Sequence, residues 1–320
     1  MALSTWKLQF RLWIAIALLF GLTYFIIIIA LNLLGYGTNF GLFAIFGLGM
    51  LLIQYLIGPS IVQRTMGVKY VTEEQAPELH QMVGDLANRA GIPKPKIGIS
   101  ETSVPNAFAF GRTKKDGRVC VTRGILNILN KEELKAVLGH ELSHINHRDM
   151  AVMTLASAIP LICYYIALSF IFRGNNRNGG GFIIGILALV AYFIGQIIVL
   201  FISRTREYYA DRGSLEIGGQ PDKLASALYK LVYGASKASK EEIKEIDGTK
   251  AFFLNNITNA KEDIQELSQL DFDYDGEISA NDLAQLKFKK VKIKSKDKIA
   301  ELFSTHPNMI KRIERLSEFV

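Results

Sequence analysis

The stretch GHELSHINHRDMAVMT, residues 139–154, joins two kinds of sequence that seldom follow one another without a break. Its first part carries histidines and carboxylates, which are common ligands of metal ions in proteins. Its last part continues, with no Gly or Pro between, into a long apolar run that starts at Met150. The fold must therefore connect a polar, metal-binding helix directly to a segment suited to lipid.

Four uncharged apolar runs interrupt the 320-residue chain, which is 49% hydrophobic and 21% charged. The runs cover residues 12–34, 40–57, 150–172 and 182–202. A helix needs about 20 apolar residues to cross the hydrocarbon core, so we expect four transmembrane helices. Buried helices of a soluble protein are the alternative, but helices that are apolar all round are unusual there. The first run is too long for a signal peptide and lacks a small-residue cleavage site, so we expect it to be retained.

Basic residues near the span ends predict the orientation. Four spans leave residues 1–11, 59–149 and 203–320 on one side. That side carries Lys7, Arg11, Arg64, Lys69, Arg148, Arg204, Arg206 and Arg212. The other side carries only Arg173 and Arg177. The positive-inside rule therefore predicts a multi-pass plasma-membrane protein with both termini and both polar segments in the cytoplasm. The net charge of +7 suits contact with the lipid bilayer, and no nucleic-acid motif accompanies it.

The first polar segment has the mixed pattern of an α+β domain. PELHQMVGDLANRAGI has helical periodicity, and KIGIS, NAFAFG and RVCVTRG are strand-like. The last two, separated by RTKKDG, predict a hairpin. Asn130 and Glu133 predict a capping box for the helix KEELKAVLGHELSHI. Cys120 and Cys163 lie far apart, so we expect neither a disulfide nor a cysteine-based zinc site.

The HExxH motif within this helix predicts a catalytic zinc site. His140 and His144 are four residues apart, so both imidazoles lie on one face and can bind one Zn²⁺ ion. Glu141 projects beside the metal, where a carboxylate can take a proton from bound water. A catalytic zinc has three protein ligands. His147 is one candidate for the third, although it lies roughly 10 Å along the helix axis from His140.

Glu207, in the segment SRTREYYAD just beyond the fourth run, is the favoured candidate for the third ligand. The alternative is a solvated carboxylate beside Arg206. Asp211 follows four residues later on the same helical face, where it is suited to hold a ligating histidine through the free ring N–H.

Several separated motifs resemble those of the HtpX-type membrane zinc metalloproteases, which are relatives of the CAAX prenyl endopeptidases. The motifs are PNAFAFG, GHELSHINHRDM, SRTREYYADRGS and STHPNMIKRIERL. The resemblance implies that His140, His144 and Glu207 bind one Zn²⁺ and that Glu141 is the general base. It also implies that His306 steadies the tetrahedral intermediate, although a structural histidine before a turn proline is nearly as good an interpretation.

The resemblance further implies that the strand at Asn106, Ala107 and Phe108 is an edge along which the substrate backbone pairs, a mode that places little demand on side chains. We therefore expect an α+β membrane protein with four transmembrane helices and a zincin-like cytoplasmic protease domain. The expected parts are two spans in 1–58, the HExxH segment 59–149, two spans in 150–202, and the segment 203–320 with the third ligand.

The expected activity is hydrolysis of peptide bonds in membrane proteins or unfolded polypeptides, in protein quality control. Such substrates suit a zinc held near the cytoplasmic membrane surface by the two spans that flank its ligands. One alternative is CAAX-type prenyl-protein processing. Another is a non-catalytic scaffold with structural zinc, against which Glu141 argues because a structural site has no use for a free carboxylate.

DFDYDGEISAND, residues 271–282, follows the calcium loop of an EF-hand position by position. The oxygen-bearing residues at positions 1, 3, 5, 7 and 12 are Asp271, Asp273, Asp275, Glu277 and Asp282. Asp at position 12 is shorter than the usual Glu, which predicts weak Ca²⁺ binding or occupation by Mg²⁺. The alternative is an acidic turn between helices. The lysine-rich segment 287–298 reads as a basic strand that is either solvated or in contact with anionic headgroups.

Overall fold

In the computed structural model, which describes most of the chain, the protein consists of two compact units. The described residues are 40–172, 180–237, 264, 266–289, 291 and 301–320. Among them, the first unit comprises Gly58–Met150 and Arg204–Val320, and the second comprises 40–57 and Ala151–Ser203. Outside the described residues lie the predicted span 12–34 and most of the lysine-rich segment 287–298.

A four-stranded sheet forms one part of the first unit, and its order in the described residues is β1-β2-β4-β3. The strands are β1 (Lys69–Tyr70), β2 (Lys96–Ser100), β3 (Ala107–Phe110) and β4 (Arg118–Thr122). β3 pairs antiparallel with β4, which confirms the predicted hairpin. β4 also pairs in parallel with β2, a pairing between segments that are distant in sequence. β3 is consequently an edge strand, with one side free of sheet partners.

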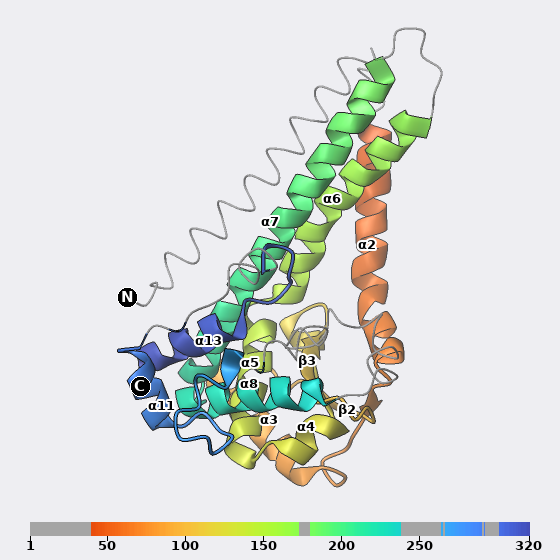
Figure 1. Cartoon of the computed structure of the whole chain (residues 1–320). Coiled ribbons are helices and arrows are strands. Elements are labelled where there is room, and N and C mark those ends of the chain that lie inside the picture. The colour runs from red at the N-terminus through yellow and green to blue at the C-terminus, as the bar shows by residue number, and fades with distance from the viewer. Residues whose placement is uncertain (1–39, 173–179, 238–263, 265, 290, 292–300) are drawn as a thin grey trace. The chain divides into compact units, whose positions relative to one another are not determined.

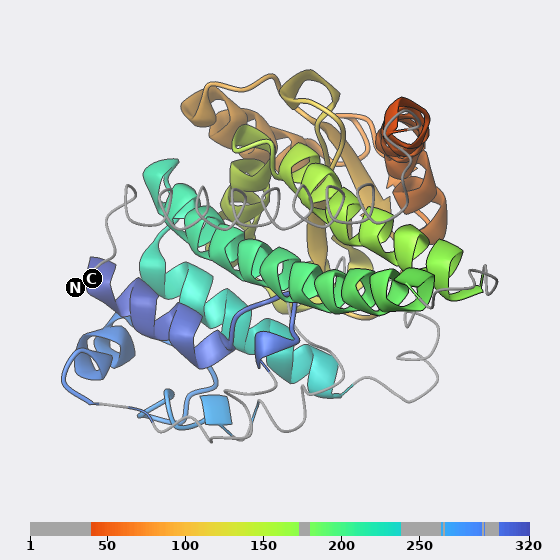
Figure 2. The same cartoon turned by 90° about the horizontal axis from the view of Figure 1, so that it is seen from above.

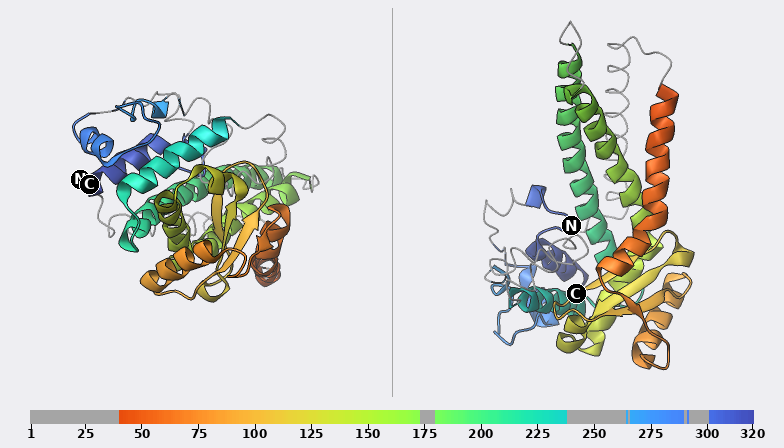
Figure 3. Two further views of the ribbon diagram at one scale, coloured as in Figure 1. Left: turned by 90° about the horizontal axis from the view of Figure 1, so that it is seen from below. Right: turned by 90° about the vertical axis from the view of Figure 1, so that its right-hand side faces the viewer.

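The first unit contains the helix that carries the HExxH motif and several other helices. They are α3 (Pro77–Ala90), α4 (Arg123–Ile128), α5 (Lys131–Asn146), α8 (Pro221–Ser236), α11 (Ala280–Leu286) and α13 (Met309–Leu316). α5 contacts α3, α8 and the edge strand β3 (Figure 1). α8 and α13 lie side by side, as the views in Figures 2 and 3 agree. The HExxH helix is thus the centre of this unit's core.

The start of α5 is fixed by the predicted capping box. The backbone N–H of Glu133 donates to Asn130 Oδ1 at 3.0 Å, and the N–H of Asn130 donates to Glu133 Oε2 at 3.0 Å. The other carboxylate oxygen of Glu133 accepts a bond from Ser226 Oγ and pairs with Lys230, both on α8. The same buried side chain therefore begins α5 and attaches it to α8.

The second unit consists of long apolar helices in its described part. α2 (Phe40–Thr65), α6 (Asp149–Phe172) and α7 (Gly180–Glu216) coincide with the second, third and fourth predicted spans and extend beyond them. α6 and α7 pack through small buried side chains such as Ala167 and Ala188. Of the described helices, one, over Gly181–Glu216, is both long and apolar enough to cross a membrane, and a shorter apolar helix covers Asp149–Tyr164.

Candidate active site

Three potential metal-binding side chains converge from α5 and α7. His140 Nε2 lies 3.2 Å from His144 Nε2 and 3.6 Å from Glu207 Oε2, and His144 Nε2 lies 3.6 Å from Glu207 Oε1. Atoms bound to a tetrahedral zinc at about 2.0–2.1 Å lie roughly 3.3 Å from one another. The two nitrogens and the carboxylate therefore have the separation that one zinc ion requires.

Reciprocal glycine–serine contacts bring the two ligand-bearing helices close together. A Cβ added at Gly139 would meet Ser214 Oγ at 2.8 Å, and one added at Gly213 would meet Ser143 Oγ at 2.0 Å. Ser214 Oγ also donates to the carbonyl of Ala136 at 2.6 Å. Since no larger residue fits at either glycine without movement, these contacts set the distance between the histidines on α5 and the carboxylate on α7.

His140 is oriented by a buried carboxylate and a buried arginine. Its Nδ1 lies 3.0 Å from Asp211 Oδ1, which leaves Nε2 directed at the other ligand atoms. Asp211 is held in turn by Arg312, whose Nε donates to Oδ2 at 2.9 Å and whose Nη2 donates to Oδ1 at 2.5 Å. The side chain of Arg312 has no exposed surface, and its Nη1 lies 3.3 Å from Glu207 Oε2. Asp211 thus lies where the sequence predicted a partner for a ligating histidine.

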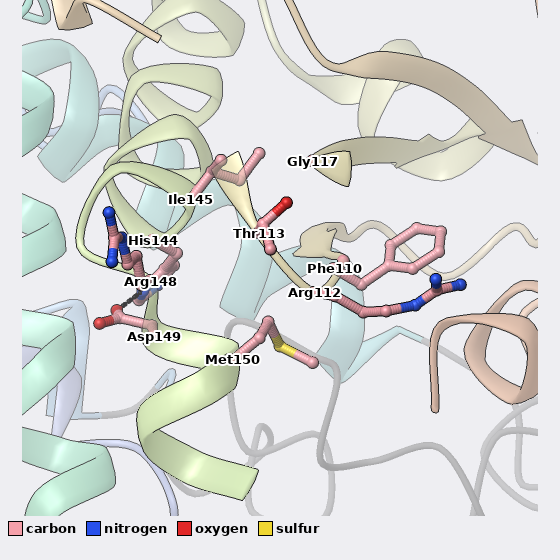
Figure 4. A pocket seen from close by; sticks show the side chains of 10 residues that line it. Phe110, Arg112, Thr113, Gly117, His144, Ile145, Arg148, Asp149 and Met150 are labelled. Atoms are coloured by element: carbon pink, nitrogen blue, oxygen red, sulfur yellow. Dashed lines mark hydrogen bonds and ion pairs between the residues drawn. The ribbon is translucent and has the colours of Figure 1, made fainter. Parts of the chain in front are cut away.

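His144 has an equivalent arrangement that the sequence interpretation missed. Its Nδ1 lies 2.5 Å from Asp149 Oδ2, and Arg206 Nη2 lies 3.1 Å from the same oxygen (the first contact is dashed in Figure 4). Asp149 is 4% exposed and stands in the first turn of α6. Its position five residues after His144 was a visible signal. No sequence signal indicated Arg206 or Arg312, because their contacts depend on tertiary packing.

Glu141 lies buried between the histidines and the edge strand. Burial raises its pKa to about 8, and the backbone of Ala109 hydrogen-bonds its carboxyl group. A nearby cation lowers the pKa of a carboxyl group, because an opposite charge favours the ionised form. The contact with Ala109 places Glu141 beside β3, along which the substrate backbone is expected to lie.

The predicted substrate-binding residues lie at the start of β3. Asn106 is fully buried, and its backbone N–H donates to Thr122 Oγ1 at 2.8 Å. Ala107 and Phe108 pair with Val121 and Cys120 of β4, the neighbour of β3 in the sheet. The backbone of this edge strand lies beside Glu141, to which Ala109 is hydrogen-bonded.

A small open pocket adjoins His144 at the other end of β3 (Figure 4). The residues around it are Phe110, Gly111, Arg112, Thr113, Gly117, His144, Ile145, Arg148, Asp149 and Met150. Ile145, Thr113 and Met150 border the space in Figure 4, and their side chains are mostly apolar. An extended peptide on β3 would place a side chain next to the metal ligands at this point.

His306 approaches the metal ligands from the C-terminal segment. Its Nδ1 lies 3.4 Å from Glu207 Oε2, and neither ring nitrogen has a hydrogen-bond partner within the described part of the chain. His147, by contrast, lies 3.2 Å from Ser143 Oγ through its Nδ1 and does not belong to the group of converging atoms. Of these two histidines, His306 is the one that faces the group of converging atoms.

The loop 271–282 has the turn of an EF-hand, and three of its carboxylates converge: Asp271, Asp273 and Asp275. Asp271 already accepts bonds from the backbone N–H groups of Asp275 and Gly276. Asp282 accepts from the N–H groups of Phe272 and Ser279 and caps α11. These hydrogen bonds order the loop, and binding of Ca²⁺ or Mg²⁺ there stays a prediction.

Two histidines and a glutamate around one point, with a glutamate beside them and an edge strand alongside, define the class of zinc-dependent HExxH hydrolases. Residues 73–320 match Peptidase family M48, and the chain belongs to this family. Its members are zinc-dependent, and the converging side chains of this chain fit that ion.

Proteins similar to this chain include two protease HtpX homologs. The one from Methanothermobacter thermautotrophicus is 64% identical over 230 residues, which are 72% of this chain and 88% of that protein. The one from Persephonella marina is 34% identical over 309 residues, covering 94% of this chain and 95% of that protein. The crystal structure of S. mikatae Ste24p shares the fold, with a TM-score of 0.53 and 17% identity over 98% of this chain and 67% of that one. The chain is therefore a membrane metalloprotease.

Proposed function

We propose that this protein is a zinc endopeptidase in which His140, His144 and Glu207 hold the ion. The spacing of the three ligand atoms, 3.2–3.6 Å, is the observation that supports it. When bound, zinc supplies Lewis-acid chemistry for hydrolysis of the peptide bond. Structural zinc sites have four protein ligands, whereas three converge here together with a free carboxylate, which favours an enzyme over a scaffold.

The residues of this chain have separate tasks in that reaction. The edge strand β3 binds the substrate in extended form, so that the scissile bond lies over Glu141. Glu141 accepts a proton from the attacking water and passes it to the departing amine. His306, whose Nδ1 faces Glu207, donates a hydrogen bond from its other ring nitrogen, Nε2, to the negative oxygen that develops during attack.

We propose that the substrates are membrane proteins or unfolded polypeptides near the cytoplasmic membrane surface, as part of protein quality control. Both ligand-bearing segments adjoin apolar helices: His144 lies five residues before the start of α6, and Glu207 lies on α7 itself. Four spans with a cytoplasmic protease domain complete the proposal. CAAX-type processing is the second candidate, supported by the likeness of the fold to Ste24p.

Purified protein tests the activity directly. We expect cleavage of casein and of a destabilised membrane protein in vesicles, loss of both on chelation, and recovery on addition of zinc. Cleavage that continues undiminished in a strong chelator would contradict zinc catalysis. Cleavage of a prenylated CAAX peptide in preference to both substrates would favour the second candidate.

Ion binding by the loop 271–282 stays a separate prediction. Calorimetry on the full-length protein should show weak uptake of Ca²⁺ or Mg²⁺ that Asp271→Ala abolishes. No heat at millimolar ion, with no difference between the two proteins, would identify an acidic turn. The active site would be unaffected by that result.

A further inference from the structure

A short turn before His306 presents two large apolar side chains to the outside. Leu302 is 50% exposed and Phe303 is 68% exposed, although both belong to the first unit, whose core buries most residues of this type. Single exposed apolar residues are common on protein surfaces. Two adjacent ones that lie three and four residues before His306, which faces the metal ligands, call for an explanation.

The turn is held firmly, so these side chains are not free to fold back into the core. The buried Arg204 donates through Nη1 to the carbonyls of Glu301, Leu302 and Ser304, at 2.8, 3.1 and 2.8 Å. The carboxylate of Glu301 accepts from the backbone N–H of Asn308 and pairs with Lys311. Backbone and charged groups in this turn thus point inward, and the apolar pair points outward.

The point of attachment indicates what covers the pair. Arg204 stands on α7, two residues beyond the apolar run 182–202, which corresponds to about 3 Å along the helix axis. A residue at that point of a membrane span lies at the boundary between hydrocarbon and headgroups. A turn bound to its side chain lies at the same depth, where an aromatic ring is favourably placed.

We propose that Leu302 and Phe303 insert into the interfacial region of the phospholipid bilayer and so fix the turn that carries His306 at the membrane surface. The backbone N–H of His306 donates to Ser304 Oγ at 3.2 Å, which couples the histidine to the anchored turn. The position of His306 relative to Glu207 then depends on the membrane as well as on the protein. The inference rests on the proposed role of α7 as a membrane span.

Tryptophan fluorescence in vesicles tests the proposal. The two tryptophans of the chain, Trp6 and Trp13, are replaced by Phe, and F303W is introduced as the reporter. The full-length protein is reconstituted in phosphatidylcholine with or without bromine on the upper part of the acyl chains. We expect F303W to lose fluorescence in the brominated vesicles and to be shielded from acrylamide in both.

Two matched reporters make the outcomes distinguishable. F193W, at a position 59% exposed within the apolar run of α7, reports whether the span is inserted. Y274W, at a position 84% exposed in the loop 271–282, reports a polar surface and should be quenched by acrylamide alone. Bromine quenching of F193W without quenching of F303W would overturn the inference and leave the span intact. If bromine quenches neither F193W nor F303W, both the inference and the proposed membrane span of α7 would be overturned.

A third result would assign the surface differently. If brominated lipid leaves F303W unchanged but unfolded casein shifts its emission, the apolar pair binds polypeptide, and the bilayer proposal is wrong. A control with Phe303→Leu, which keeps an apolar side chain, should retain proteolysis in vesicles. Phe303→Asp should reduce it while zinc content stays equal, because the metal ligands lie on other elements.

Discussion

At the scale of single residues, each histidine of the proposed zinc site is held by a carboxylate, which is held in turn by an arginine. His140 contacts Asp211, which pairs with Arg312, and His144 contacts Asp149, which pairs with Arg206. Carboxylates in this position fix the tautomer and orientation of a ligating imidazole and raise its basicity. The arginines compensate the cost of burying the carboxylates.

Removal of one carboxylate charge should weaken metal binding without changing the ligands. We expect Asp149→Asn and Asp211→Asn each to lower zinc affinity by about 10–100-fold, the usual effect of losing such a partner. Competition with a chromophoric chelator measures the affinity. Asp222→Asn, in the first turn of α8, is a matched control that should leave it unchanged. If Asp149→Asn and Asp211→Asn both bind zinc with wild-type affinity, these carboxylates do not position the histidines for metal binding.

Replacement of Glu141 should separate catalysis from metal binding. Glu141→Gln preserves size and leaves the three ligand atoms in place, so we expect a full equivalent of zinc and a loss of hydrolysis of about 10²–10⁴-fold. Glu207→Ala should instead lower the zinc content itself. Metal analysis together with casein cleavage measures both effects. Full activity in Glu141→Gln would exclude it as the general base.

The sequence was informative where the relevant residues belong to one local pattern. His140 and His144 are four residues apart on one helix, so their shared face followed from helical geometry alone. Glu207 could be assigned only through resemblance to a family, because nothing local connects it to α5. The role of Arg312 could not be predicted from the sequence, because its two carboxylate partners lie on α7 and no local pattern indicates that packing.

At the scale of elements, the contact between α5 and α7 determines whether a metal site exists. The two helices meet at glycines, and a methyl group at Gly213 would stand 2.0 Å from Ser143 Oγ. Gly213→Ala should therefore separate the helices and cost about 1–3 kcal/mol, as overpacked cores do. Zinc affinity should fall with it, because Glu207 lies on the displaced helix. Thermal unfolding and chelator competition measure the two effects.

Two further variants distinguish packing from a general effect of replacing glycine. Ser143→Gly in the Gly213→Ala background removes the clashing oxygen and should restore much of the zinc affinity. Gly84→Ala, on α3, adds a methyl group that meets only the Lys94 side chain at 3.8 Å, so stability should stay the same or rise. If the double variant binds zinc no better than Gly213→Ala, close packing is not what sets the ligand spacing.

Element boundaries followed the sequence best where short-range chemistry fixes them. The capping box at Asn130 and Glu133 and the β3–β4 hairpin were both predicted and confirmed. The parallel pairing of β2 with β4 was not predicted, since it joins strands separated by β3. Glu207 and Asp211 were predicted on one helical face just beyond the fourth apolar run, and α7 does continue as one helix from that run to Glu216. Gly213, which lies within this stretch, does not end the helix.

At the scale of the whole molecule, the proposed topology assigns opposite sides of the membrane to the short links and the polar segments. Basic residues flank the segments 59–149 and 203–320, and Lys and Arg are favoured on the cytoplasmic side. We therefore expect the link 35–39 to lie outside the cell and the protease unit inside. The two native cysteines do not interfere with a thiol-labelling test, because Cys120 has no exposed surface and Cys163 is 2% exposed.

Single cysteines introduced on the two sides test this topology in intact cells. Thr38→Cys, in the link 35–39, should react with a membrane-impermeant maleimide added outside. Lys131→Cys, at a side chain 71% exposed in the first turn of the HExxH helix, should react only after the membrane is permeabilised. Each variant must first retain proteolysis, so that labelling reports the folded protein. Labelling of Lys131→Cys in intact cells would place the active site outside the cytoplasm, where it would meet a different set of substrates.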